Sequence, residues 1–288
     1  MPALTVGELE EALFSEFPRA DAEPWDSPGL AVGMRSAPVG KVAVNLDMST
    51  AAVLAAASAG CDVLVTHHPA YIKEGPGELG PSDQTSATGP GRMFYEAARR
   101  SISAIAMHTN ADRAVSVREE YAALLGMRCI GNFEHLLDPS RDVLATGFGA
   151  LLEPPAPSEP TAPEFTLADL AARCLDAFGG APRVWGDPAR PITRVALLNG
   201  SWSDPTIYPT CADAGVDAIV VGERRYHLCL DAAPHLSTIE LGHDKSELAI
   251  EGVLASALER AGIGPERIVR LRCSRENWWT PAREVGHV

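Results

Sequence analysis

Short apolar segments rich in Val, Ile and Leu recur along the chain, and each ends abruptly in polar residues. Runs of this kind are typical of strands that are buried on both faces of a sheet. Helical spacing of apolar residues appears between several of the runs and after the last one. We predict strands at residues 42–46, 63–65, 102–107, 195–198, 218–221 and 238–241, and helices at 51–58, 117–125 and 250–258. This alternation of strands and helices predicts an α/β fold with mainly parallel sheets.

The chain also resembles itself. Residues 59–65 and 214–220 both begin with Ala-Gly, carry Asp at the fourth position, and continue with three apolar residues. Each copy follows a predicted strand and helix and precedes a third strand that ends in a His-containing segment. The shared order predicts two related halves, each a mainly parallel or mixed sheet with flanking helices. Coincidence is the alternative, because Gly and Asp are common at turns between helices and strands.

Two stretches rich in Pro or Gly interrupt this pattern. Five prolines between residues 153 and 163 exclude a helix or a central strand there. We therefore predict an N-terminal half at 1–152, a proline-rich connection at 153–164 and a C-terminal half at 165–288, packed as one compact unit. The second stretch, 74–91, predicts either a mobile loop beside the site discussed below or an insertion without a role.

Composition narrows the class of protein. The net charge of −14 argues against a nucleic-acid partner, which would need clustered Lys and Arg. The six cysteines form no Cys-x-x-Cys pair, so neither a disulfide framework nor a thiolate zinc site is expected. No apolar run approaches the roughly 20 residues that span a bilayer, and the N-terminus lacks the order of a signal peptide. We expect a cytoplasmic protein without a membrane partner.

Candidate chemistry gathers where the predicted strands end. Ligands of α/β proteins bind outside the carboxyl ends of the strands, where loops converge. Four of the eight histidines lie at such ends. The polar residues at these positions are Asp47, Thr66-His67-His68, His108 to Asp112, Asn199-Gly200-Ser201, Glu223, and His243 to Glu247.

The residue types and their spacing predict a site for two metal ions between the halves. His67 and His68 end one strand, where both side chains can turn toward one site and serve one metal each. Glu247 follows His243 by four residues at a helix start, so these two can share a helix face. Asp112 supplies a second carboxylate. Mixed imidazole and carboxylate ligands suit Zn, Mn, Fe, Co or Ni.

Each of these features also has a purely structural interpretation. A pair of adjacent histidines is commonly a surface or packing feature. Glu247 near a helix start is favoured by the helix dipole alone, and Asp112 could cap the helix that follows it.

Four motifs in order resemble a known family. They are Trp25-Asp26 followed by Gly29-Leu30 and Gly33, His67-His68-Pro69, His108-Thr109-Asn110-Ala111-Asp112, and Gly242-His243 with Glu247. Over nearly its whole length the chain is similar to the Nif-three-like dinuclear-metal proteins, often called GTP cyclohydrolase 1 type 2. The resemblance implies metal ligands at His67, His68, Asp112, His243 and Glu247. It also implies a homohexameric ring with the metal sites facing an inner cavity.

The chain departs from the family pattern near the expected pocket. Val221-Gly222-Glu223 stands where the family has Thr-Gly-Glu, and residues 113–116 replace a glycine-rich stretch. Gly200-Ser201-Trp202 replaces a Gly-Ser-Gly turn, which places an indole near the pocket. These departures bear on which substrate would bind, because the residues matched to metal ligands follow the family pattern.

These observations predict a metal-dependent hydrolase that acts on a nucleotide, a related heterocycle or a phosphoester. His108, Glu223 and His227 are candidates for moving protons, and Asp47 and Trp202 for contacting the substrate. Two other functions stay open: a metal-binding scaffold without catalysis, and a biosynthetic enzyme that uses redox-active iron or copper in the same ligand frame.

Overall fold

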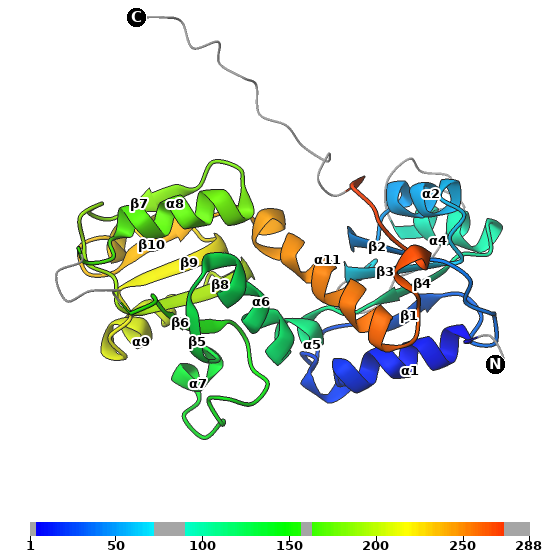
Figure 1. Cartoon of the computed structure of the whole chain (residues 1–288), viewed down its shortest axis with the longest axis horizontal. Helices are drawn as coiled ribbons and strands as arrows, with labels where there is room; N and C mark the ends of the chain where they lie inside the picture. Colours follow the sequence, from blue (N-terminus) through cyan, green and yellow to red (C-terminus); the bar gives the residue numbers. More distant parts are fainter. Residues whose placement is uncertain (1–3, 72–89, 157–162, 274–288) are drawn as a thin grey trace, which may run out of the picture.

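The computed structural model describes residues 4–71, 90–156 and 163–273, and these form two mixed sheets flanked by helices (Figure 1). The first sheet has five strands within the described ranges, in the order β1-β4-β3-β2-β11. They are β1 (Gly29–Val32), β4 (Ser103–Ala106), β3 (Val63–His68), β2 (Val42–Asp47) and β11 (Ile268–Arg270). Only β1 runs antiparallel to its neighbour.

The second sheet has six strands in the same part of the chain, in the order β5-β6-β8-β9-β10-β7. They are β5 (Arg128–Gly131), β6 (Ala150–Glu153), β8 (Val195–Ser201), β9 (Ala218–Glu223), β10 (Ser237–Glu240) and β7 (Arg183–Trp185). The strands β8, β9 and β10 are parallel, and the others pair antiparallel at the edges. The predicted α/β class and all six predicted strands are confirmed, while the short edge strands were not predicted.

The internal resemblance corresponds to one repeated structural device. Gly60 and Gly215 follow the ends of equivalent helices with φ of 70° and 68°, a left-handed conformation that favours glycine. Asp62 then accepts hydrogen bonds from the two backbone amides that precede β2, at 2.9 and 2.8 Å. Asp217 accepts from the two amides that precede β8, at 2.7 and 3.0 Å. In both halves the aspartate therefore fastens the entry of one strand to the start of the neighbouring strand.

The helices form three layers around the two sheets. A central apolar cluster joins one face of each sheet to α1 (Val6–Glu16), α6 (Val115–Leu125), α8 (Leu167–Phe178) and α11 (His243–Arg260). The outer face of the first sheet packs on α2 (Thr50–Ser58) and α4 (Pro90–Arg99). The outer face of the second packs on α9 (Ile207–Asp213) and α10 (Tyr226–Ala232). Across the described ranges, no helix combines the length and the apolarity that a membrane crossing requires.

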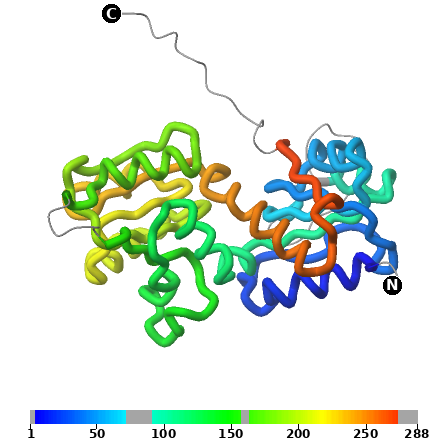
Figure 2. The backbone as a smooth tube through the Cα atoms, viewed as in Figure 1, coloured from blue at the N-terminus to red at the C-terminus, as the bar shows by residue number. Residues whose placement is uncertain are grey.

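The helix α11 connects the two sheets. It contacts β2 and β3 of the first sheet and β8 and β9 of the second, and Figure 2 shows it, in orange, running from one to the other. Ile250, Leu254 and Leu258 lie on its buried face and are fully buried. The amino-terminal end of α11 therefore lies between the halves, close to the carboxyl ends of strands from both.

Each predicted half contributes strands to the sheet of the other half. β5 and β6 precede the proline-rich connection but belong to the second sheet, and β11 at the end of the described chain belongs to the first. The division at 152 and 165 stays a prediction about folding units. Most of the predicted 74–91 loop, and residues 157–162 of the connection, lie outside the described residues.

Because α11 belongs to the core of both sheets, its packing should govern the stability of the whole chain. We expect Leu254→Ala to lower the free energy of unfolding by about 2–5 kcal/mol, the usual cost of such a cavity. The control is Leu175→Ala on α8, where the leucine is 48% exposed, with an expected change within about 0.5 kcal/mol. Urea denaturation followed by circular dichroism measures both, and equal losses would contradict the role assigned to α11.

Candidate metal centre

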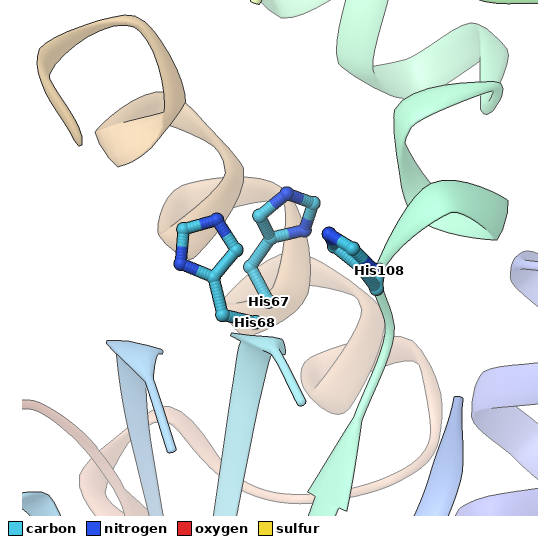
Figure 3. Close-up of side chains that lie close together, drawn as sticks. All are labelled: His67, His68 and His108. Carbon is cyan, nitrogen blue, oxygen red and sulfur yellow. The ribbon is translucent and has the colours of Figure 1, made fainter. Parts of the chain in front are cut away.

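The predicted cluster of polar side chains forms at the carboxyl ends of the strands, between the halves. His67 and His68 end β3, and His108 lies just after β4. Asp112 ends the short helix α5 (Thr109–Asp112), while His243 and Glu247 lie in the first turns of α11. Figure 3 shows the rings of His67, His68 and His108 gathered above the strand ends.

Within this cluster, two groups of potential ligands share one carboxylate. The first is His67, Asp112 and Glu247, and the second is His68, His243 and Glu247. In the first group, Nε2 of His67 lies 3.5 Å from Oδ1 of Asp112 and 3.8 Å from Oε1 of Glu247. In the second, Oε2 of Glu247 lies 2.9 Å from Nε2 of His68 and 3.2 Å from Nε2 of His243. Glu247 thus presents one oxygen to each group.

Three histidines of the cluster are each held through the same ring atom. The Nδ1 atom of each lies near an oxygen acceptor: the Met107 carbonyl for His67 at 3.0 Å and the Asp47 carboxylate for His68 at 2.7 Å. His243 is held in the same way by Glu223 at 3.1 Å. With Nδ1–H donated backwards, each Nε2 lone pair faces the cluster, as it does in histidines that bind metals.

The buried carboxylates and a buried unpaired nitrogen favour the binding of cations in the cluster. Asp112 and Glu247 are both buried, and Nε2 of His67 is buried with no hydrogen-bond partner among the described residues. A buried polar atom without a partner costs free energy, and so does a pair of neighbouring carboxylates. Divalent cations would satisfy both, so the donor set fits two metal ions.

Without metal, protons would take the place of cations. Burial by itself lowers the pKa of His68, but hydrogen bonds to Asp47 and Glu247 raise it to about 10 overall. A hydrogen bond to Glu247 is the largest cause that raises the pKa of His243, to about 9. Burial raises the pKa of Glu247, yet contacts with the three histidines around it hold that pKa well below its ordinary value. Glu247 is therefore ionised and lies beside the protonated rings of His68 and His243.

The backbone of β8 approaches the cluster closely at Gly200. Its φ is +69°, and a Cβ atom there would lie 2.6 Å from Oε1 of Glu247. The amide of Gly200 donates to Oγ of Ser246 at 3.0 Å, and that hydroxyl donates to the carbonyl of His243 at 2.7 Å. The second sheet is thereby fastened to the first turn of α11 directly beside the shared carboxylate.

A cavity of about 560 Å³ opens on one side of the cluster. Its walls include the indoles of Trp25 and Trp202, the ring of Phe148, and the backbone of β8 at its end. His68, His108, Asp112, His243 and Glu247 line it as well. The candidate metal centre therefore faces a space large enough for a small molecule.

The remaining predicted residues take different places. Asp47 and Glu223 lie behind His68 and His243, where they accept hydrogen bonds from the rings. His108 joins His67 and His68 in a third potential ligand group. His227 is exposed on α10 and does not line the cavity, whereas Trp202 does.

Sequence reasoning gave no role to Asp26. This buried carboxylate accepts from Nδ1 of His108 at 2.8 Å, and from both the amide and the hydroxyl of Thr109. Burial raises the pKa of Asp26, but the contacts with His108 and Thr109 lower it to about 2, so it is ionised. Its place in the Trp-Asp motif was the only available signal, because it lies in a loop without periodicity.

Asn199 is a second residue whose role the sequence did not define. Its side-chain amide donates to Oδ1 of Asp112 at 2.5 Å, and its own carbonyl accepts the indole N–H of Trp202 at 2.7 Å. The second sheet therefore positions a carboxylate that belongs to the first half.

Comparison with known proteins identifies the family. The GTP cyclohydrolase 1 type 2 homolog of Streptomyces coelicolor is 30% identical over 253 residues, which cover 86% of this chain and 82% of that protein. Its namesake in Clostridium acetobutylicum is 27% identical over 242 residues, covering 83% and 84%. The fold matches a Staphylococcus aureus hypothetical protein with a TM-score of 0.77 at 22% identity, covering 97% of this chain and all of the other. Residues 4–271 match the profile of a family described as Duf34/NIF3 (NGG1p interacting factor 3), and the chain belongs to that family.

Proposed function

We propose that this protein is a dinuclear metal-dependent hydrolase acting on a nucleotide, a related heterocycle or a phosphoester. The observation that supports it best is the pair of ligand groups joined by Glu247. The names of the relatives point toward a nucleotide-like heterocycle.

In this proposal, one ion is held by His67, Asp112 and Glu247, and the other by His68, His243 and Glu247. Two divalent ions at such a site supply Lewis acidity, activate water, and stabilise negative charge on both the attacking and the leaving oxygen. Two carboxylates and three neutral imidazoles leave the pair of ions with net positive charge, which suits an oxygen-bearing substrate.

His108 is the residue best placed to handle protons. It lines the cavity but belongs to neither of the two groups that share Glu247. Since Asp26 accepts from its Nδ1, the proton that His108 can take up or release is the one at Nε2, toward the cavity. Asp47 and Glu223 orient His68 and His243, and we assign neither to proton transfer.

Two ions per chain is the first expected outcome. Protein purified without chelator, or reloaded and desalted, should contain close to two equivalents of transition metal by elemental analysis. A content near zero after reloading would exclude the metal centre. Redox-active iron or copper in the purified protein would favour a redox enzyme, and two metals without turnover of nucleotides, phosphoesters or cyclic amides would favour a scaffold.

Replacing a proposed metal ligand should lower metal affinity more than replacing a residue that only orients a ligand. We expect Asp112→Asn to reduce metal affinity by more than the roughly 10–100-fold that the loss of an orienting partner costs. Asp47→Asn, which alters only the partner of His68, and His108→Ala serve as matched comparisons. Competition with a metal-binding dye measures all three, and wild-type affinity in Asp112→Asn would overturn the assignment.

The homohexameric ring stays a prediction that rests on the family resemblance. Light scattering coupled to gel filtration should give about six times the chain mass of 30.5 kDa. A monomer across micromolar concentrations would refute it.

A further inference from the structure

Three aromatic side chains, Trp25, Phe148 and Trp202, line the cavity beside the candidate metal ligands. The indole N–H of Trp202 donates to the Asn199 carbonyl at 2.7 Å. Its ring packs edge-on against Phe133 and Phe148, with ring centroids 6.0 and 5.8 Å away. Trp25, which is 41% exposed, lies edge-on to the ring of His108 at 6.0 Å. The cavity therefore has one fixed indole and one half-exposed indole, as a site for a planar ring requires.

The same walls carry no fixed positive charge. Among the described residues that line the cavity there is neither Lys nor Arg, and its carboxylates are those of Glu23, Asp112 and Glu247. His68 and His243 donate Nδ1–H to carboxylates and turn Nε2 toward the metal centre, and His108 donates its Nδ1–H to Asp26. Among the described side chains that line the cavity, none offers a ligand a fixed positive charge, so the metal ions would supply most of it there.

Arg113 packs against the wall without serving the cavity. Its guanidinium lies 3.9 Å from the centroid of Phe148 but is buried. Its nitrogens donate to both oxygens of Glu134, to Glu23 at 2.5 Å, and to the carbonyl of Asp21. With two carboxylates and a carbonyl around it, Arg113 is a buried structural ion pair and does not line the cavity.

These charges decide between the classes of ligand. Proteins hold phosphate chains with Arg, Lys or free helix amino termini, because each phosphate needs its own donors. Here α11 begins at His243 on the cavity wall, but its first turns already carry the proposed metal ligands His243 and Glu247. Two divalent ions offset by Asp112 and Glu247 can accept one oxygen-bearing group at the floor of the cavity. A second and a third phosphate would face indoles and the Glu23 carboxylate.

Building on the hydrolase proposed above, we propose that this cavity takes an uncharged planar heterocycle, of the size of a nucleobase or a nucleoside, and selects against nucleoside polyphosphates. The ring lies against Trp202, and a carbonyl oxygen on its edge meets the metal centre. Trp202 is then a specificity-determining residue, while Asp112 and Glu247 serve the metals.

A matched pair of ligands tests the charge argument. With the zinc-loaded full chain, isothermal calorimetry should show guanosine binding at least as tightly as GTP. Ser201→Arg places a cation on the cavity wall and should tighten the binding of GTP relative to that of guanosine about tenfold. Ser58→Arg, on the exposed end of α2 away from the cavity, is the control and should change neither.

Wild-type protein that binds GTP tenfold more tightly than guanosine would overturn the proposal, and so would no guanosine binding at millimolar concentration. These outcomes are separate from the fate of the hydrolase. Guanosine bound without turnover of any heterocycle or phosphoester would remove the hydrolase and leave the cavity's selectivity standing. Preferential binding and hydrolysis of GTP would overturn the proposed selectivity and support the hydrolase.

Substitution of the indole tests the stacking. Trp202→Ala should weaken guanosine binding roughly tenfold to hundredfold, the usual effect of removing an aromatic platform. Trp202→Phe keeps a ring but loses the bond to Asn199, and it should recover most of the affinity. Metal analysis must give two equivalents in both variants, and Trp185→Ala on β7, outside the cavity, is the control. Unchanged guanosine affinity in Trp202→Ala, with metals retained, would show that the ring does not lie on this indole.

Discussion

The Glu247 carboxylate is buried among histidines, and much of the architecture serves to make that burial possible. An ionised carboxylate in a dry interior is costly unless charged or hydrogen-bonded partners surround it. Here the partners come from both halves: His67 and His68 end a strand of the first sheet, while His243 lies one turn earlier on the same helix. Gly200 leaves the space that the carboxylate occupies. The positions of β3, β8 and α11 are all constrained by this one group.

The repeat explains how two halves arrive at a single site. In each half, the segment that enters a helix after the third parallel strand carries a histidine followed four residues later by a carboxylate: His108 and Asp112 after β4, His243 and Glu247 after β10. The two halves contribute differently to the ligand groups. Glutamate has one methylene more than aspartate, and Glu247 reaches both ligand groups, whereas Asp112 belongs to one. The first half also supplies the adjacent ligands His67 and His68, which have no counterpart after β9, so two similar frameworks give an asymmetric centre.

Local pattern was sufficient to predict the parallel strands and the convergence of their polar ends. Buried parallel strands are continuous apolar runs, and a shared sheet edge follows from their direction. The strands β1, β5, β6, β7 and β11 escaped prediction because each is short and lies at an edge of its sheet or, for β6, next to an edge strand, with partners set by the tertiary fold. Asp26 and Asn199 escaped for a related reason. Their roles depend on partners more than 80 residues away along the chain, at His108 and Asp112, and no local period records such a contact.

The exchange of strands between the sheets has a consequence for how the chain can be divided. The proline-rich connection resembles a boundary, yet a cut there would leave the first fragment with β5 and β6 stripped of the β8 edge that pairs with β6. The same fragment would lack β11 beside β2 and the apolar face of α11 beneath β2 and β3. The second fragment would expose the β8 edge in turn. Neither piece contains a complete sheet of its own, so each would depend on the other for strand partners at a sheet edge.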